Sequence, residues 1–209
     1  MRVQARREQQ RQALRETILE AAREALIQQG YEGFSMRKLA ERIGYSPGTI
    51  YLHFEAKEDL LGQLIEEAFS KLLEALHEVH DSRDAMQSLR NKLRAYIDFG
   101  LRFPNHYHFA FIMRPGGGTG PPPLRPHASF DVLRNAVRRC VDQKRFRSSD
   151  VETISQVLWA TIHGITSLLI VLPNFPWVGR DRVIDQVIDT AIDGLSEPSA
   201  RTDSKEETS

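Results

Sequence analysis

Residues 35–54, with the sequence SMRKLAERIGYSPGTIYLHF, constrain this chain most, because they encode two short helices joined by a sharp turn. In the first half, apolar residues recur at three- and four-residue spacing on one helical stripe, which consists of Met36, Leu39, Ala40 and Ile43. Gly44 suits the left-handed position that ends a helix, and Ser46 and Pro47 supply an N-cap hydroxyl and a first-turn ring for the next one. Two helices this close in sequence cannot lie antiparallel, so the stretch predicts a helix-turn-helix.

The second predicted helix has a composition suited to the major groove of DNA. Ile50 and Phe54 are four residues apart and anchor it against a small core. Gly48 removes a side chain near the helix N-terminus, where backbone N–H groups attract anions and can approach a phosphate closely. Polar tips come from Thr49, Tyr51 and His53. A short helix of this kind fits a major groove; the alternative is that its polar residues pack inside an ordinary all-α protein.

Residues 30–60 resemble the DNA-reading segment of TetR-type transcriptional regulators. The match consists of G-Y-x-G-F-S-x-R-x-L-A at residues 30–40, G-x-S-x-G-T-I-Y-x-H-F at residues 44–54 and K-E-x-L at residues 57–60, within a likeness covering about residues 11–71. The turn, caps, anchors and flanking helices occur in the family's order, so the match is specific. Two departures are mild: Tyr45 stands where the family often has Val or Met, and Ala56 stands where it often has Ser, which weakens the next N-cap.

The resemblance implies that each copy of the chain inserts residues 46–53 into a major groove. In that arrangement Tyr51 and His53 anchor on phosphate, and Thr49 contacts the DNA backbone or a base edge. Lys57 is also expected to contact a phosphate, because the helix dipole does not favour a cation in the first turn of a helix. The full set predicted to contact DNA is Ser35, Arg37, Ser46, Pro47, Gly48, Thr49, Tyr51, His53 and Lys57.

The composition permits a DNA-binding function without demanding it. The 209 residues carry no formal net charge, so the overall balance does not indicate a nucleic-acid partner. Residues 1–15 nevertheless hold five arginines against one glutamate, and this arm either lies along phosphates or is a frayed, solvated terminus. Cys140 is the only cysteine, which excludes an intrachain disulfide and fits a reducing cytoplasm. No run of about 18 apolar residues predicts a membrane span.

Periodicity and helix-breaking residues predict an all-α protein with two domains. The expected parts are a basic arm at 1–10, a DNA-binding domain at 11–71, a regulatory and dimerisation domain at 72–195 and a disordered tail at 196–209. Helices are predicted at about residues 9–29, 57–79, 85–103, 127–146, 151–172 and 180–195. The Gly- and Pro-rich residues 115–126 predict a mobile surface loop, and they lack the lysine and following Ser or Thr of a phosphate-binding loop.

An aromatic cluster that begins at Phe99 and ends at Phe111 is dense enough to line a small-molecule cavity, although a simple aromatic core would use the same residues. Trp159-x-x-x-His163-Gly164 resembles the Trp-His-Gly signature of one TetR subgroup. Trp159 and His163 share a helix face and either meet the cluster at a ligand cavity or pack in the core. The predicted ligand-binding set is Phe99, Phe103, His106, Tyr107, Phe109, Phe111, Phe130, Trp159 and His163.

No metal or cofactor is predicted. His77 and His80 are three residues apart, and His106 and His108 are two apart, but neither pair comes with cysteine or a dense carboxylate cluster. No nucleophile, base and orienting group occur at supportive spacing, so an all-α enzyme built on the aromatic and histidine-rich segment is the weaker alternative.

The helix predicted at 151–172 is apolar on more than one face, which indicates that it contacts its own core and something beyond it. Small or polar residues would let a second helix approach closely, namely Ala160, Gly164, Thr166 and Ser167. Together with the helix at 180–195 it would form a four-helix bundle across a two-fold axis. The family resemblance implies the same homodimer, which places two reading heads about one DNA turn, roughly 34–36 Å, apart.

These observations predict a cytoplasmic, homodimeric, all-α transcriptional regulator of TetR type. We expect a repressor that binds a palindromic double-stranded DNA operator and is released by a small apolar or aromatic effector. The alternatives within the same class are an activator and a DNA binder that needs no ligand.

Overall fold

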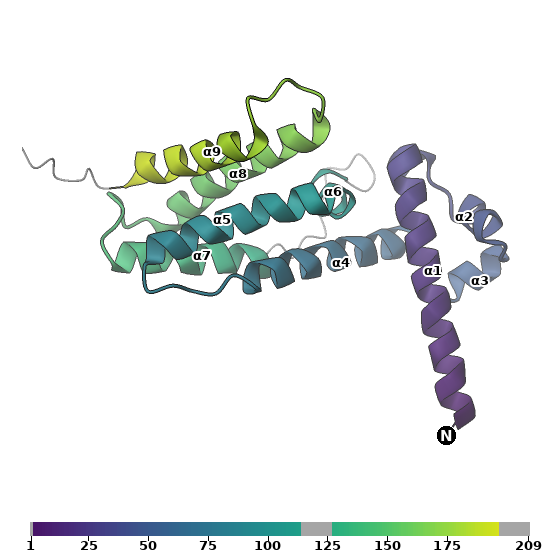
Figure 1. Cartoon of the computed structure of the whole chain (residues 1–209). Helices are drawn as coiled ribbons and strands as arrows, with labels where there is room; N and C mark the ends of the chain where they lie inside the picture. The colour runs from purple at the N-terminus through teal and green to yellow at the C-terminus, as the bar shows by residue number, and fades with distance from the viewer. Residues whose placement is uncertain (1, 114–126, 197–209) are drawn as a thin grey trace, which may run out of the picture. The chain divides into compact units, whose positions relative to one another are not determined.

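The computed structural model describes residues 2–113 and 127–196, and they form an all-α fold, as the sequence predicts (Figure 1). An isolated antiparallel bridge joins Phe146 to Ser196. The predicted loop at 115–126 and nearly all of the predicted tail at 196–209 lie outside the described residues. The elements are α1 Arg2–Gly33, α2 Met36–Ile43, α3 Pro47–Tyr51, α4 Lys57–His77, α5 Ala85–Arg102, α6 Pro104–Tyr107, the π-helix η1 His108–Ile112, α7 His127–Asp142, α8 Val151–Val171 and α9 Arg180–Leu195.

Contacts divide the chain into two compact units. The first unit comprises residues 1–75 and 99–129, and the second comprises residues 76–98 and 130–209. This grouping places the aromatic segment after α5 with the N-terminal helices, whereas the predicted domain boundary near residue 71 places that segment in the C-terminal domain.

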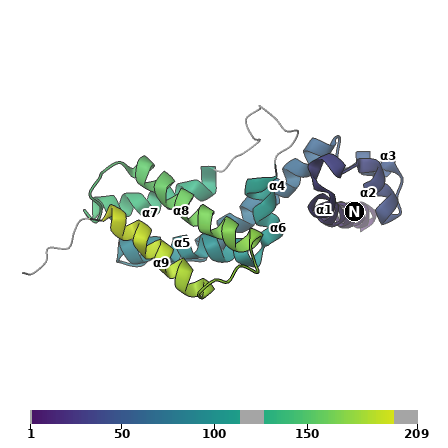
Figure 2. The same cartoon turned by 90° about the horizontal axis from the view of Figure 1, so that it is seen from above.

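Helix α1 begins at Arg2, earlier than the predicted start near residue 9, so the basic arm is helical rather than frayed. Helical geometry breaks at Gly30, whose φ of 69° lies in the left-handed region that glycine adopts without strain. The chain then continues to Gly33, and α2 and α3 lie beside α1 in both views (Figures 1 and 2).

The turn between α2 and α3 has the chemistry that the sequence predicts. Gly44 ends α2 in the left-handed conformation with φ 74°, and the N–H of Tyr45 donates to the carbonyl of Ala40 at 3.0 Å. Ser46 caps α3 by accepting a hydrogen bond from the Thr49 N–H at 3.2 Å, and Pro47 opens the helix.

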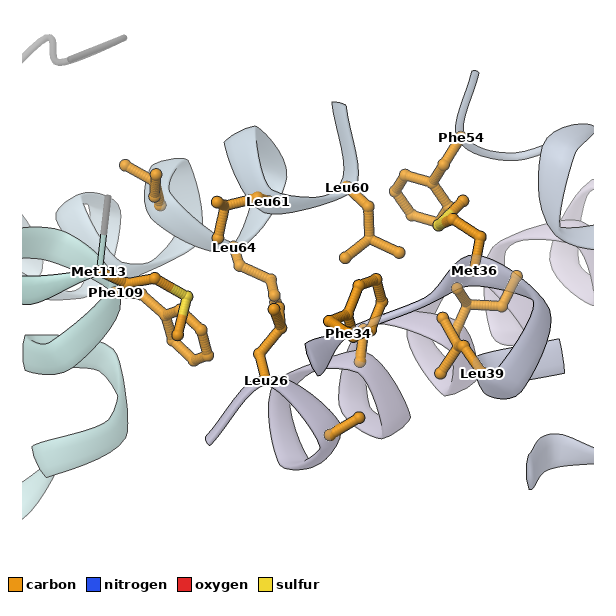
Figure 3. Packing of buried hydrophobic residues seen from close by; sticks show 14 of the residues in the cluster. Leu26, Phe34, Met36, Leu39, Phe54, Leu60, Leu61, Leu64, Phe109 and Met113 are labelled. Carbon is orange, nitrogen blue, oxygen red and sulfur yellow. The ribbon is translucent and has the colours of Figure 1, made fainter. Parts of the chain in front are cut away.

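One hydrophobic core unites the helices of the first unit (Figure 3). Leu26 of α1, Leu39 of α2 and Leu64 of α4 are each about 1% exposed. Phe109 and Met113 belong to the same core and lie beside Leu64 and Leu26 in Figure 3. The segment around η1 is therefore part of the core that supports the helix-turn-helix.

Helices α8 and α9 pack side by side in the second unit (Figures 1 and 2). Their buried residues recur at helical spacing and include Leu158, Ile162 and Leu169 of α8 and Ile184, Ile188 and Ile192 of α9. Arg94 of α5 adds ion pairs at 2.9 Å to Asp98 and at 3.0 Å to Asp185 of α9.

Helix α7 ends at Asp142, not at residue 146 as predicted. Lys144 adopts a left-handed φ of 54°, and the N–H groups of Lys144 and Arg145 donate to the carbonyls of Val141 and Cys140. These bonds close the helix early without a glycine, so no residue in the sequence signals the earlier end.

Candidate DNA-binding site

Helix α3 has five residues, too few to be stable alone, so its position depends on its anchors. The Ser46 cap holds its N-terminal end. Ile50 and Phe54 are both 0% exposed and fix its inner side in the core. Both were predicted as anchors.

The outer side of α3 is open to solvent. Tyr51 is 52% exposed and Leu52 is 78% exposed, so Tyr51 is not a packed core residue. Ser46, Pro47 and Gly48 are exposed as well. A Cβ at Gly48 would meet only the Ser46 hydroxyl at 3.8 Å, an ordinary contact, so internal packing does not require glycine there.

The other residues predicted to contact DNA differ in their exposure and in their hydrogen bonds within the chain. Arg37 is exposed and pairs with Glu41 at 3.2 Å, an exposed pair of little stabilising value that a phosphate can displace. Ser35 and His53 are half-buried. Thr49 is half-buried, and its hydroxyl lies 2.9 Å from that of Ser46.

His53 lies at the far end of the α3 region in a positively charged setting. Burial lowers the pKa of its imidazole, and the charges of Arg11 and Arg15 lower that pKa further. In the absence of DNA, the neutral ring of His53 is therefore favoured.

Lys57 has internal partners that the sequence did not reveal. Its ammonium lies 3.7 Å from the centre of the Tyr31 ring and donates to the Tyr31 carbonyl. These contacts account for a cation in the first turn of α4, so a bound phosphate is not needed to explain Lys57. The contact between Lys57 and DNA stays a prediction.

Tyr31 is held from its other end by a hydrogen bond from its hydroxyl to the Glu58 carboxylate at 2.7 Å. Burial and the Glu58 carboxylate raise the pKa of Tyr31 to about 12, and the same hydrogen bond lowers the pKa of Glu58. The end of α1 is thereby joined to the first turn of α4, the helix that follows the recognition segment.

The predicted ligand-binding residues fall into separate clusters. In the first unit, Phe109 is packed in the hydrophobic core and Tyr107 is 0% exposed, as the simple aromatic core would have them. Phe103 lies 5.8 Å from Phe99 and 5.7 Å from His106, measured between ring centres. Phe111 packs edge-on against Phe69, a residue absent from the predicted set.

The other three residues meet in the second unit. The ring of Trp159 lies 6.0 Å from Phe130 and 5.7 Å from His163. The His163 Nδ1 atom lies 3.0 Å from the Tyr96 hydroxyl, the hydrogen bond expected of a histidine with a core role. Tyr96 lies outside the predicted ligand-binding set.

Among residues 2–113 and 127–196, no group of three histidine, cysteine or carboxylate side chains is placed to hold a metal ion. Helix α8 is the one described helix that is long and apolar enough to cross a membrane, with a mean hydropathy of 1.6 over its most apolar window. Core helices of water-soluble proteins share these properties, so they assign no membrane location.

The exposed α3 on a capped helix-turn-helix defines a DNA-binding protein, and two family models agree with it. Residues 18–64 match the bacterial regulatory proteins of the tetR family, and residues 89–195 match the tetracyclin repressor-like C-terminal domain. The chain belongs to the TetR family of transcriptional regulators. The likeness of Trp159, His163 and Gly164 to the Trp-His-Gly subgroup stays a prediction.

Relatives show where the similarity is concentrated. The HTH-type transcriptional repressor AcnR of Corynebacterium diphtheriae is 41% identical over 64 residues, which is 31% of this chain and 34% of that protein. The chain thus spans about a third of the length of the first curated relatives that it matches. The HTH-type transcriptional activator FasR of Mycolicibacterium smegmatis is 25% identical over 182 residues, covering 85% of this chain and 77% of that protein.

A solved structure shares the fold over most of the chain. A protein of unknown function from Rhodococcus sp. RHA1 superposes with a TM-score of 0.73 at 26% identity and covers 88% of this chain and 96% of its own. The fold therefore extends well beyond the short stretch shared with the repressor AcnR.

Proposed function

We propose that two copies of the chain form a homodimer that binds a palindromic DNA operator in the cytoplasm, with α3 of each copy in a major groove. In this proposal the dimer represses transcription until a small apolar or aromatic effector lowers its affinity for the operator. The observation that carries the proposal is the exposed surface of α3, where Tyr51 and Gly48 face solvent while Ile50 and Phe54 are buried.

Helix α8 supports the dimer. Exposed small and apolar residues recur along it at three- and four-residue spacing, and we call them the α8 stripe: Val157, Ala160, Gly164, Leu168 and Val171. A Cβ at Gly164 would meet nothing within 4 Å, so the backbone there is open to close approach. A second copy would cover this stripe, which otherwise exposes apolar surface to water.

Two residues of α8 that were predicted to permit close approach differ in their exposure to solvent. Gly164 lies in the α8 stripe, but Thr166 is 0% exposed and its hydroxyl donates to the Ile162 carbonyl at 2.6 Å. Thr166 faces the chain's own core, because it lies about half a turn away from Gly164 on the helix.

The effector role rests on the aromatic cluster of the second unit. The rings of Phe130, Trp159 and His163 lie against one another there, and the Tyr96 hydroxyl is hydrogen-bonded to His163. Such an aromatic set suits an apolar or aromatic compound. The compound changes operator affinity only to the extent that it binds the free and DNA-bound conformations differently.

An activator is the second candidate, because the relative that covers 85% of the chain is named as an activator. The two candidates predict opposite results for a reporter gene placed behind the operator. Repression lowers expression when the protein is present, whereas activation raises it.

Selection of bound duplexes from a random DNA pool tests the proposal. We expect an enriched palindrome, bound by two chains, and an apparent affinity that falls when an effector is added. Binding that no compound changes would favour the ligand-independent alternative, and enrichment of non-palindromic sites by a monomer would contradict the proposal.

A further inference from the structure

Arg15 of α1 reaches across the helix-turn-helix to the end of the recognition segment. Its Nη1 donates to the carbonyl oxygen of His53 at 3.0 Å, between residues 38 positions apart. The guanidinium also lies over the ring of Phe54, 4.4 Å from the ring centre. One side chain thus contacts both the backbone and the core anchor at the C-terminal end of this segment.

The end that Arg15 contacts is also held by the backbone: the N–H groups of Leu52, His53 and Phe54 donate to carbonyls of α3, and Phe54 is buried. The carbonyls in the last turn of a helix have no partner within the helix, and a cation there also complements the helix dipole. Helix α3 ends at Tyr51, and residues 52–54 follow it directly. After these residues, the Glu55 N–H donates to the Asp59 carboxylate at 3.2 Å.

We propose that Arg15 is a positioning residue of the DNA-binding site, which fixes residues 52–54 against α1 so that His53 and Tyr51 face the DNA. It acts through the His53 carbonyl and the Phe54 ring and makes no DNA contact of its own. This inference rests on the proposed function, since it assigns how that same site is held.

Arg11 provides the natural contrast, because it lies one helical turn before Arg15 on the same side of α1. It is exposed, and within residues 2–113 and 127–196 it forms no hydrogen bond or ion pair, although its charge acts on His53. A phosphate near His53 would therefore be met by Arg11, while Arg15 is already engaged.

Arginine is better suited than lysine to this position. The planar guanidinium can stack on Phe54 and direct one N–H to the His53 carbonyl at the same time, whereas the ammonium of lysine is a point charge without a flat face. Replacement by lysine keeps the charge and removes the planar stacking of the guanidinium on Phe54. The two substitutions therefore separate charge from geometry.

The test uses the full chain and a selected palindromic duplex, with affinity measured across a range of salt concentrations. Arg15→Ala and Arg15→Lys should each weaken binding about tenfold at fixed salt, the size of one charge-assisted hydrogen bond, with the salt slope of the unaltered chain. Arg11→Ala should flatten the slope by about one for each head, and Arg11→Lys should restore it.

A second readout works without DNA. Amide hydrogen exchange at residues 52–54 should be faster in Arg15→Lys than in the unaltered chain, while the thermal midpoint falls by no more than about 2–4 °C. Faster exchange supports the positioning role even if the unaltered chain ignores every duplex, in which case the proposed function fails by itself. Three outcomes would overturn the inference. They are unchanged amide exchange at residues 52–54 in Arg15→Lys, DNA affinity of Arg15→Lys equal to that of the unaltered chain, and a salt slope that Arg15→Ala flattens.

Discussion

Apolar residues in the core of the first unit and apolar residues on helix α8 differ in their exposure to solvent. Leu26, Leu39 and Leu64 are almost fully covered by their own chain, and the large apolar side chains that this unit exposes around α3 are Tyr45, Tyr51 and Leu52. The α8 stripe instead leaves apolar side chains 43–64% exposed. In the proposed function, the first unit presents α3 to DNA, whereas the α8 stripe would be covered by a second copy.

The largest expected effect is loss of stability from the covered core. Leu39→Ala removes a side chain that is 1% exposed, and it should lower the free energy of unfolding by about 2–5 kcal/mol. Urea unfolding measures the loss, and hydrogen exchange in α2 assigns it to the first unit. The exposed Leu52→Ala serves as the control and should change stability by less than about 0.5 kcal/mol. Equal losses would mean that the core is not placed as described.

The next effect concerns the α8 stripe. Leu168→Arg should weaken dimerisation at least about 100-fold, because a symmetric interface would bury two unpaired charges. Sedimentation equilibrium measures the dissociation constant. Gln87→Arg on the exposed face of α5 adds the same charge elsewhere and should leave the dimer intact. A Leu168→Arg dimer as tight as the original would exclude this stripe as the contact.

A smaller effect separates stability from DNA binding within α3. Gly48→Ala places a methyl group where only the Ser46 hydroxyl lies nearby, so stability should stay equal or rise by up to about 1 kcal/mol. Operator affinity should fall about tenfold if the backbone at Gly48 approaches a phosphate closely. Thermal unfolding and a DNA titration of the same sample give both values, and unchanged affinity would exclude that close approach.

The smallest effect is the pH dependence at the end of α1. The pKa of Tyr31 is raised to about 12, so its bond to Glu58 stabilises the fold below about pH 10 and this contribution is lost as the pH rises through 12. On the acid side, the lowered pKa of Glu58 means that its contribution is present above its ordinary pKa and is lost as the pH falls through the lowered value. Ultraviolet titration should show one tyrosine of Glu58→Gln ionising at lower pH than in the original, with Tyr31→Phe identifying that transition.

Local signals in the sequence predicted the helix-turn-helix well. The φ preference of Gly44, the Ser46 cap and the spacing of Ile50 and Phe54 act over a few residues, and the structure shows each of them as expected. The fold class followed from helical periodicity for the same reason.

Long-range contacts account for what the sequence could not show. No local pattern indicates that Phe109 shares a core with Leu26, that Lys57 stacks on Tyr31, or that Arg15 contacts His53. Each of these contacts joins residues tens of positions apart. The sequence alone therefore favours a ligand-binding role for the aromatic residues after α5, although several of them are buried in the first unit.

Titration of a selected palindromic duplex at low ionic strength, with the mass of the complex measured, tests the central claim most directly. We predict two chains per palindrome, and for Tyr51→Ala an affinity lower by about tenfold or more with the dimer intact. A single bound chain, or a Tyr51→Ala variant that binds as tightly as the original, would contradict the claim that paired α3 helices read the operator.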